Sequence, residues 1–138
     1  MAKPSRVASA TVPVAGVPMV RRTLAAFAGA TRIARVLVVV APGDHALDDL
    51  GALVTIADCG GATRAESVFN GLNALQAQGA QAQDWVLVHD AARCLVTPTL
   101  IDTLIDACLP DAVGGLLALP LADTLKAAGD DGRVAATV

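Results

Sequence analysis

Aromatic residues are nearly absent from this sequence, and charged residues are few. Phe, Trp and Tyr together make up 2% of the 138 residues and charged residues 17%, whereas hydrophobic residues make up 54%. The apolar content is therefore carried by Ala, Val and Leu, which are small or branched. A chain of this length fits one domain, residues 1–138, that can bury roughly two thirds of the surface of its unfolded state. We predict a single domain with one sizeable core.

Long apolar runs and an excess of positive charge are also lacking. The longest apolar run, residues 36–42, is far shorter than the roughly 20 residues of a membrane-spanning helix, and no signal-peptide pattern opens the chain. The net charge is −3 and the pI is near 5.1, whereas binding to a nucleic acid backbone depends on many Lys and Arg contacts. The sequence predicts a soluble, unsecreted protein that binds neither membrane nor nucleic acid; a small phosphorylated ligand is left open.

The cysteines form neither a disulfide nor a metal pattern. There are three, Cys59, Cys94 and Cys108, an odd number without C-x-x-C spacing, which argues against a disulfide framework and against a zinc site. We interpret each as a small, buried or half-buried hydrophobic residue. Free thiols suit a reducing compartment, so we predict a cytoplasmic protein.

Four short apolar runs recur at intervals that can each hold a helix. They are rich in Val, Leu and Ile, and each predicts a strand buried on both faces: residues 35–40, 53–56, 85–88 and 115–119. Strands that alternate with helices are typical of βαβ units. We therefore predict an α/β fold with a mostly parallel sheet.

Three helices are predicted together with the residues that start them. Residues 18–28 have apolar side chains at helical spacing. Thr63 and Glu66 have the spacing of a capping box, in which each side chain accepts a hydrogen bond from the other residue's backbone amide. Thr97 is a candidate N-cap for a helix over residues 98–108, which begins with proline.

The ends of the chain depart from the usual pattern of a nucleotide-binding domain. Such a domain opens with an apolar strand and a Gly-rich loop whose amides hold phosphates at a helix N-terminus. Here the first clear element is a helix, and residues 7–15 are only weakly apolar, without G-x-G-x-x-G or G-x-x-x-x-G-K-[ST]. Either residues 7–14 take the place of a central strand or residues are missing. We interpret the chain as cut at both ends.

Charged residues follow the predicted strand at residues 85–88. Asp90 and Arg93 come at its carboxyl end, where open α/β sheets bind ligands. A carboxylate there can hold Mg²⁺, and an arginine can bind a phosphate through two hydrogen bonds. The alternative is that the two side chains only pair with each other. His89 is either an acid or base, or a residue whose imidazole hydrogen-bonds locally.

Two further segments have the residue types of a phosphate or nucleotide site. Gly60 and Gly61 lie between a predicted strand and a capped helix, where a ligand could meet the backbone and the free amides of that helix. The alternative is an ordinary Gly-containing turn. Thr124 and Lys126 also follow a predicted strand and suit either a phosphate site or a solvated loop. The two histidines do not suggest a catalytic triad.

Three motifs taken together resemble those of the 2-C-methyl-D-erythritol 4-phosphate cytidylyltransferases. They are GGATRAESV at residues 60–68, VLVHDAAR at residues 86–93 and DTLK at residues 123–126, in the order and approximate spacing of that family. The resemblance spans about residues 12–138. It implies a three-layer, Rossmann-like nucleotidyltransferase domain with a mostly parallel sheet, lacking the family's first strand and Gly-rich loop. Residues 121–138 would be the start of a dimerisation arm, which implies a homodimer.

The resemblance also implies a reaction. A cytidylyl group would pass from CTP to 2-C-methyl-D-erythritol 4-phosphate, giving CDP-methylerythritol and pyrophosphate, with Mg²⁺, in the non-mevalonate route to isoprenoids. No covalent enzyme intermediate is involved. The protein's task is to align two anions and to stabilise the charge of the transition state.

Each motif residue takes a role from this resemblance. Asp90 would be catalytic and would hold Mg²⁺, directly or through water. Methylerythritol phosphate would contact Arg93, Lys126 and Thr124, the last from the partner subunit's arm. The nucleotide, with its cytosine read by the backbone and by a hydroxyl, would contact Gly60, Gly61, Ala62, Ser67, Asp90 and Ala91.

Several basic groups of that family have no counterpart in this sequence. They are the basic residue of its Gly-rich loop, a Pro-Lys pair, and a basic residue of the arm just beyond the position of Val138. Their loss would raise the barrier by on the order of several kcal/mol, so the chain as written is predicted to be inactive. Two other functions stay open: a non-catalytic nucleotide-binding or assembly module, and a sugar-phosphate nucleotidyltransferase that uses another NTP.

Overall fold

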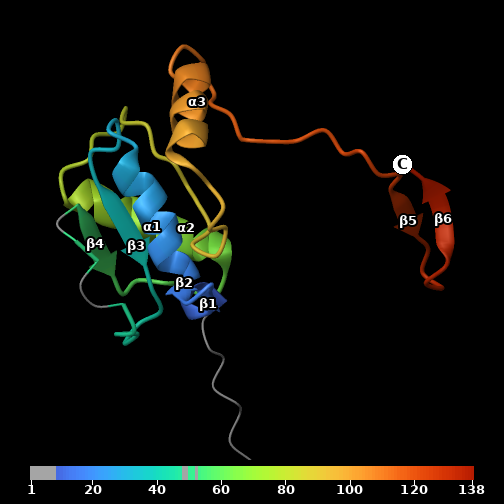
Figure 1. The fold of residues 1–138 in the computed structure, drawn as a ribbon, viewed down its shortest axis with the longest axis horizontal. Coiled ribbons are helices and arrows are strands. Elements are labelled where there is room, and N and C mark those ends of the chain that lie inside the picture. Colours follow the sequence, from blue (N-terminus) through green and yellow to red (C-terminus); the bar gives the residue numbers. More distant parts are fainter. Residues whose placement is uncertain (1–8, 48–49, 52) are drawn as a thin grey trace, which may run out of the picture.

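The computed structural model describes residues 9–47, 50–51 and 53–138. Helices and short strands alternate along most of this part of the chain (Figure 1). In chain order the elements are the 3₁₀ helix η1 (Ser9–Thr11), β1 (Pro13–Val14), β2 (Val17–Pro18), α1 (Met19–Gly29), β3 (Val36–Val39), β4 (Val54–Ala57), α2 (Arg64–Ala77), α3 (Pro98–Cys108), β5 (Lys126–Ala128) and β6 (Val134–Thr137).

The centre of the fold is the parallel pair of β3 and β4. Val36 lies opposite Val54, and Val39 opposite Ala57. Both runs form the predicted parallel strands. The predicted burial on both faces is wrong, because β3 is half-buried and Thr55 and Ile56 of β4 are exposed. The other two strand pairs, β1 with β2 and β5 with β6, are antiparallel.

All three predicted helices are confirmed, and the capping residues explain where two of them begin. The Thr63 hydroxyl accepts from the Glu66 amide at 3.1 Å, while the Glu66 carboxylate accepts from the Thr63 amide at 3.2 Å. This is the predicted capping box of α2. The Thr97 hydroxyl caps α3 by accepting from the Leu100 amide at 3.3 Å.

The helices cover both faces of the β3–β4 pair. On one face lies α2, so close that a Cβ on Gly71 would be 2.8 Å from the Val39 side chain. The opposite face carries α1 and α3, whose Phe27 and Ile101 form the buried core with Val36 packed against them. The arrangement is the predicted three-layer α/β sandwich, with helix, sheet and helix in succession (Figure 1).

Two predicted strands are absent. Residues 85–88 and 115–119 form no strand in the structure, so those two predictions are wrong. A strand exists only where a neighbour pairs with its backbone, and both runs lack such a neighbour within the described part of the chain. Of residues 7–14, proposed as a central strand, residues 7–8 lie outside the described residues. The rest form η1 and the first strand of the β1–β2 pair instead.

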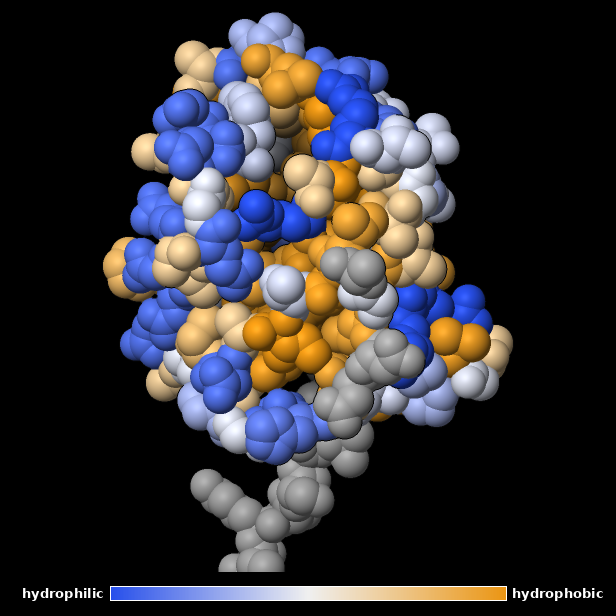
Figure 2. All heavy atoms as spheres, turned by 90° about the vertical axis from the view of Figure 1, so that its left-hand side faces the viewer, coloured by the Kyte–Doolittle hydropathy of each residue, from blue (hydrophilic) through white to orange (hydrophobic). Residues whose placement is uncertain are grey.

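The core is much smaller than the composition predicts. A compact protein of 13.9 kDa exposes about 6,700 Å², whereas this chain exposes 10139 Å². Phe69 is 64% exposed and Leu95 85% exposed. Figure 2 shows hydrophobic side chains gathered in the middle of one face, with hydrophilic ones around them. The prediction of one sizeable core is therefore wrong, because the apolar strands needed to close it do not pair.

The C-terminal hairpin of β5 and β6 stands apart from the rest of the molecule. An extended segment leads to it from the end of α3 (Figure 1). Within this segment Val113 and Leu119 are each more than 90% exposed. No helix in the described residues is both long and apolar enough to cross a membrane.

The cap of α2 generates the first prediction. Thr63→Ala removes the hydroxyl that accepts from Glu66 and should lower the free energy of unfolding by about 1 kcal/mol. The matched control is Thr99→Ala, because Thr99 is exposed and its hydroxyl caps no amide. Urea unfolding followed by circular dichroism measures both. Equal midpoints for the two variants would contradict the assignment of the cap.

Candidate functional site

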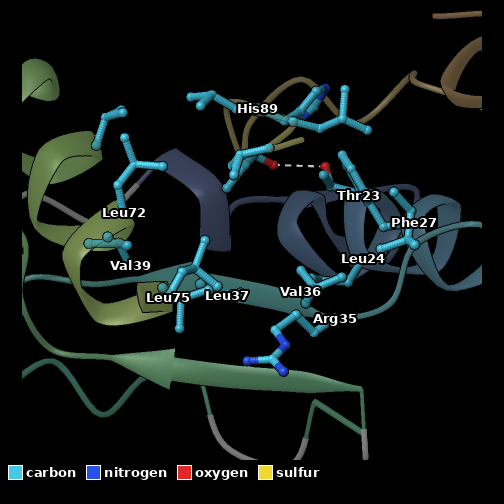
Figure 3. A pocket seen from close by; sticks show the side chains of 18 of the residues that line it. Thr23, Leu24, Phe27, Arg35, Val36, Leu37, Val39, Leu72, Leu75 and His89 are labelled. Atoms are coloured by element: carbon cyan, nitrogen blue, oxygen red, sulfur yellow. Dashed lines mark hydrogen bonds between the residues drawn. The ribbon is translucent and has the colours of Figure 1, made fainter. Parts of the chain in front are cut away.

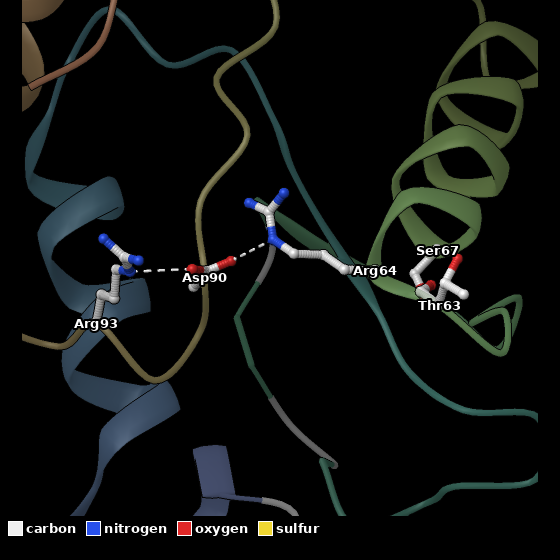
Figure 4. Close-up of polar contacts among 5 residues, drawn as sticks. All are labelled: Thr63, Arg64, Ser67, Asp90 and Arg93. Carbon is white, nitrogen blue, oxygen red and sulfur yellow. Dashed lines mark hydrogen bonds and ion pairs between the residues drawn. The ribbon is translucent and has the colours of Figure 1, made fainter. Parts of the chain in front are cut away.

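Asp90 lies between two arginines at the edge where β3 and β4 end. The Arg64 Nε donates to Asp90 Oδ1 and the Arg93 Nε to Oδ2, each at 2.9 Å. Arg64 reaches across from the first turn of α2, while Arg93 closes the loop that contains Asp90 (Figure 4). The carboxylate is therefore shared between two separate parts of the chain.

The two guanidinium groups fix the charge of Asp90. The hydrogen bond from Arg64 and, to a lesser extent, the positive charge of Arg93 lower the pKa of the Asp90 carboxyl. The carboxyl is therefore ionised at neutral pH. Asp90 and Arg93 do pair, as the alternative interpretation expected, but not only with each other, because Arg64 shares the carboxylate. Sequence reasoning missed Arg64. The capping box accounted for the residues around it, and nothing in the sequence points to a partner 26 residues away.

The turn at residues 60–63 satisfies its own amides. The Gly61 amide donates to the Ser67 hydroxyl at 3.0 Å, and the Ala62 amide donates to Glu66 at 2.7 Å. Ser67 in turn donates to the Thr63 carbonyl at 2.9 Å. The expectation of free amides at this helix N-terminus is therefore wrong for Gly61 and Ala62. A ligand that binds there must replace these internal hydrogen bonds.

Packing explains why the turn contains two glycines. A Cβ on Gly60 would lie 2.8 Å from the Val40 carbonyl oxygen, and a Cβ on Gly61 would overlap the Glu66 side chain. Any larger residue would push the turn away from the end of β3. The glycines thus allow close packing of the turn, whatever else they do for a ligand.

Two buried or half-buried polar side chains hold the site loops in place. Thr23 of α1 is 5% exposed, and its hydroxyl donates to the Ala91 carbonyl at 2.8 Å. Asn70 of α2 donates to the Cys59 carbonyl at 2.8 Å. Sequence reasoning missed both residues, since a single Thr or Asn within a helix carries no signal of a distant loop.

His89 has an apolar environment. Its ring meets the Phe27 ring edge-on, with centroids 5.3 Å apart. Its Nδ1 is buried and has no hydrogen-bond partner among the described residues, so the interpretation of a locally hydrogen-bonded imidazole is wrong for this atom. Burial lowers the pKa of His89, against the smaller opposing effect of Asp90. The imidazole is therefore neutral at pH 7.

Thr124 and Lys126 do not join this site within one chain. Lys126 belongs to β5, and its Nζ donates to the Thr137 hydroxyl at 2.6 Å. Thr124 is exposed in the segment that leads to the hairpin. Figure 1 shows that hairpin well away from α2, the helix that carries Arg64. Of the predicted residues, the structure pairs Asp90 with Arg93 and, in a separate segment, Gly61 with Ser67. The two segments are joined by Arg64, which follows the turn and binds Asp90.

The residues around Asp90 could bind a metal ion only if a bound nucleotide and water supplied most of the ion's coordinating oxygens. In the described ranges there is no cluster of three or more His, Cys, Asp or Glu side chains that could hold one. Asp90 is a single carboxylate. Mg²⁺ commonly binds through one or two carboxylates together with phosphates and waters. The donor set therefore fits Mg²⁺ that arrives with a nucleotide.

Comparisons with known proteins converge on one family. The family model described as "IspD: 2-C-methyl-D-erythritol 4-phosphate cytidylyltransferase" matches residues 6–138. A bifunctional enzyme IspD/IspF from Albidiferax ferrireducens is 64% identical over 130 residues, which cover 91% of this chain and 30% of that protein. The Nitrosomonas eutropha 2-C-methyl-D-erythritol 4-phosphate cytidylyltransferase is 51% identical over 131 residues, covering 91% of this chain and 56% of the relative. The chain thus spans about half the length of the single-function relative.

Solved structures agree with the fold. A 4-diphosphocytidyl-2C-methyl-D-erythritol synthase superposes with a TM-score of 0.85 at 37% identity, over 94% of this chain and 62% of that one. The Thermus thermophilus cytidylyltransferase gives a TM-score of 0.70 at 33% identity, over 93% and 58% of the two chains. The predicted Rossmann-like nucleotidyltransferase fold is confirmed.

The buried imidazole generates a prediction on pH. Because the pKa of His89 is lowered in the folded state, the unfolded chain binds the proton more tightly. The free energy of unfolding should therefore fall as the pH drops below the unfolded value of 6.5, with a slope of at most about 1.4 kcal/mol per pH unit. Asp90 adds nothing in this window, since its pKa lies below 3.8.

Two histidine variants test this assignment. His89→Gln should flatten the dependence of unfolding free energy on pH between 7.5 and 5. His45→Gln removes the other histidine, which is exposed, and should leave the slope unchanged. Urea unfolding at a series of pH values gives both slopes. If His45→Gln flattened the dependence and His89→Gln did not, the assignment would be wrong.

Proposed function

Because the chain belongs to the 2-C-methyl-D-erythritol 4-phosphate cytidylyltransferase family, we propose that it forms the nucleotide-binding part of an enzyme that transfers a cytidylyl group from CTP to methylerythritol phosphate. The observation that carries the proposal is the placement of Asp90 between Arg64 and Arg93, beside the Gly60–Ser67 turn. That edge is where an open α/β sheet receives a nucleotide.

The proposed reaction is a direct displacement at phosphorus. An oxygen of the substrate phosphate forms a bond to the α-phosphorus of CTP, and the bond from that phosphorus to the pyrophosphate oxygen breaks. Pyrophosphate leaves with the electron pair. Both reactants are anions, so the protein contributes alignment and positive charge. Among the described residues, Arg64 and Arg93 are the cations paired with Asp90.

The Gly60–Ser67 turn and the Asp90 loop are proposed to bind the nucleotide. The Gly61 and Ala62 amides and the Ser67 hydroxyl would bind the cytosine, which has both donors and acceptors to offer. Each would exchange its internal hydrogen bond for one to the base. Gly60, Asp90 and Ala91 would lie along the base and ribose. A purine would be excluded by the close packing of the turn.

The second substrate is proposed to bind across two subunits. Arg93 would hold the methylerythritol phosphate by two hydrogen bonds. Thr124 and Lys126 would contact the same phosphate from the partner subunit's arm, of which residues 121–138 form the start. The projecting β5–β6 hairpin supports this proposal, since it lies away from its own site (Figure 1). We infer a cytoplasmic homodimer.

Asp90 is the residue proposed to hold Mg²⁺, directly or through water. The ion supplies positive charge to the CTP phosphates when bound. To accept it, the carboxylate must give up a hydrogen bond to Arg64 or Arg93. The released guanidinium would then be free to bind a phosphate oxygen. Asp90 thus links the metal to the position of an arginine.

If Asp90 exchanges an arginine for Mg²⁺, replacing Asp90 should change CTP affinity in opposite directions with and without the metal. With Mg²⁺ present, Asp90→Asn should weaken CTP binding about tenfold or more, because the carboxylate for the ion is lost. With EDTA, the same variant should bind CTP as tightly as the parent or more tightly, because a negative charge is removed and two arginines are released. Isothermal titration calorimetry measures all four affinities.

The matched control is Asp131→Asn, which breaks the ion pair with Arg133 in the hairpin and should change neither affinity. ATP and GTP test the base. Binding of GTP as tight as that of CTP would favour a nucleotidyltransferase that uses another NTP. Equal weakening by Asp90→Asn with and without Mg²⁺ would contradict the metal role.

A further inference from the structure

One polar side chain is buried in the apolar face of α1. The buried residues of this helix are Val20, Thr23, Ala26 and Phe27, and among the described residues Thr23, at 5% exposure, is the buried polar one. A hydroxyl in an apolar environment costs free energy unless it is hydrogen-bonded. A valine would fill nearly the same volume without that cost. Packing alone therefore does not explain a threonine at this position.

The hydroxyl of Thr23 binds a loop outside its own helix. A threonine within a helix commonly donates to the carbonyl four residues earlier, and the Thr23 Oγ1 lies 3.2 Å from that acceptor, the Met19 carbonyl. Its shorter hydrogen bond, at 2.8 Å, goes to the carbonyl of Ala91, which is 68 residues away in the sequence. Figure 3 shows this hydrogen bond as a dashed line between α1 and the loop that carries His89. A hydroxyl has a single proton, so the shorter bond to the loop is the main one.

A second contact from α1 lies on the other side of Asp90. The Phe27 ring, one helical turn after Thr23, meets the His89 ring edge-on, with centroids 5.3 Å apart. The residues before and after Asp90 are thus both fixed to one face of α1, the first by a ring contact and the second by a hydrogen bond. Both α1 residues are buried, so water has little access to either contact.

The two arginines at Asp90 depend on these contacts to different extents. Arg93 belongs to the same turn as Asp90, since its amide donates to the Asp90 carbonyl at 2.9 Å. Arg64 reaches Asp90 from α2, on the face of the β3–β4 pair opposite to α1. A movement of the loop relative to α1 would carry Arg93 along with Asp90 but would change the distance to Arg64. The contacts with α1 therefore control the pair between Asp90 and Arg64.

We propose that Thr23 is a positioning residue for the candidate site: its hydroxyl holds the loop of residues 89–93 against α1, so that the Asp90 carboxylate stays within reach of Arg64. Thr23 touches no ligand in this role and acts through Asp90. Groups that align reactants must themselves be held in place by well-packed neighbours. The step from Arg64 to CTP rests on the cytidylyl transfer proposed above, whereas the step from Thr23 to Arg64 does not.

Removal of the hydroxyl should affect the two arginines differently. Thr23→Ala deletes it without pressing a methyl group against the Ala91 carbonyl. Exchange of the arginine Nε protons with water, measured by NMR on the full chain without nucleotide, reports each ion pair. Exchange at Arg64 should become about fivefold faster, the size expected for the loss of one hydrogen bond, while exchange at Arg93 should stay within about twofold of the parent.

Matched variants separate positioning from a general loss of stability. Thr23→Ser keeps the hydroxyl and should retain the slow exchange at Arg64. Thr103→Ala on α3 also removes a hydroxyl that donates to a carbonyl four residues earlier, at 2.8 Å, and should change neither arginine. The parent gives a check that needs no variant, because the proton of a buried, hydrogen-bonded Thr23 hydroxyl should exchange slowly enough to give an NMR signal.

CTP binding tests the last step. With Mg²⁺, isothermal titration calorimetry should show CTP binding to Thr23→Ala about fivefold more weakly than to the parent, and to Thr23→Ser about as tightly as to the parent. If the parent itself bound no CTP, the proposed function would fail, while the arginine exchange rates would still decide the role of Thr23.

Four results would overturn the proposal. They are unchanged exchange at Arg64 in Thr23→Ala, equal acceleration at Arg64 and Arg93, fast exchange at Arg64 in Thr23→Ser, and the absence of a slowly exchanging Thr23 hydroxyl proton in the parent. Equal acceleration at both arginines would mean that the loop loosens as a whole, as a purely structural role of Thr23 requires. Binding of CTP to Thr23→Ala as tight as to the parent would overturn the link to the nucleotide.

Discussion

The backbone of β3 is the constraint on which the rest of this structure depends. A strand between two helix layers has water at neither face, so its amides and carbonyls must find partners along both edges. Along one edge, the Val36 and Val40 amides donate to the carbonyls of Leu53 and Ala57, next to and within β4. The other edge, at Leu37 and Val39, has no hydrogen-bond partner in the described part of the chain. The small core beside β3 follows from that unpaired edge, and the extended segment and hairpin after α3 add to the exposed surface of 10139 Å².

The polar groups of the candidate site are bound to one another. Asp90 is bound by Arg64 and Arg93, and the Gly61 amide is bound by Ser67. The polar groups that a nucleotide would meet are thus satisfied by one another. They are held in place through helix contacts, such as the Thr23 hydroxyl on the Ala91 carbonyl. These side chains are positioned without a ligand, and a ligand that bound there would have to replace their internal hydrogen bonds.

Sequence reasoning succeeded where the decisive interactions are local. The capping box of Thr63 and Glu66 and the cap at Thr97 gave the starts of two helices, because the partners lie three residues apart. The runs at β3 and β4 were found because each has the other to pair with. The motif at residues 86–93 identified the family, but the strand predicted within it failed, since a strand depends on a neighbour that its own sequence does not contain. Arg64 was missed for the same reason, as its partner Asp90 is 26 residues away.

Hydrogen exchange along β3 tests the central claim most directly. Amide exchange rates for Val36, Leu37, Val38 and Val39, measured by NMR on the chain alone, report which edge is paired. The account predicts alternation: slow exchange at Val36 and Val38, whose amides face β4, and exchange at least tenfold faster at Leu37 and Val39, whose amides point to the opposite, unpaired edge. Uniform protection of all four amides would contradict it, because the second edge of β3 would then already be paired.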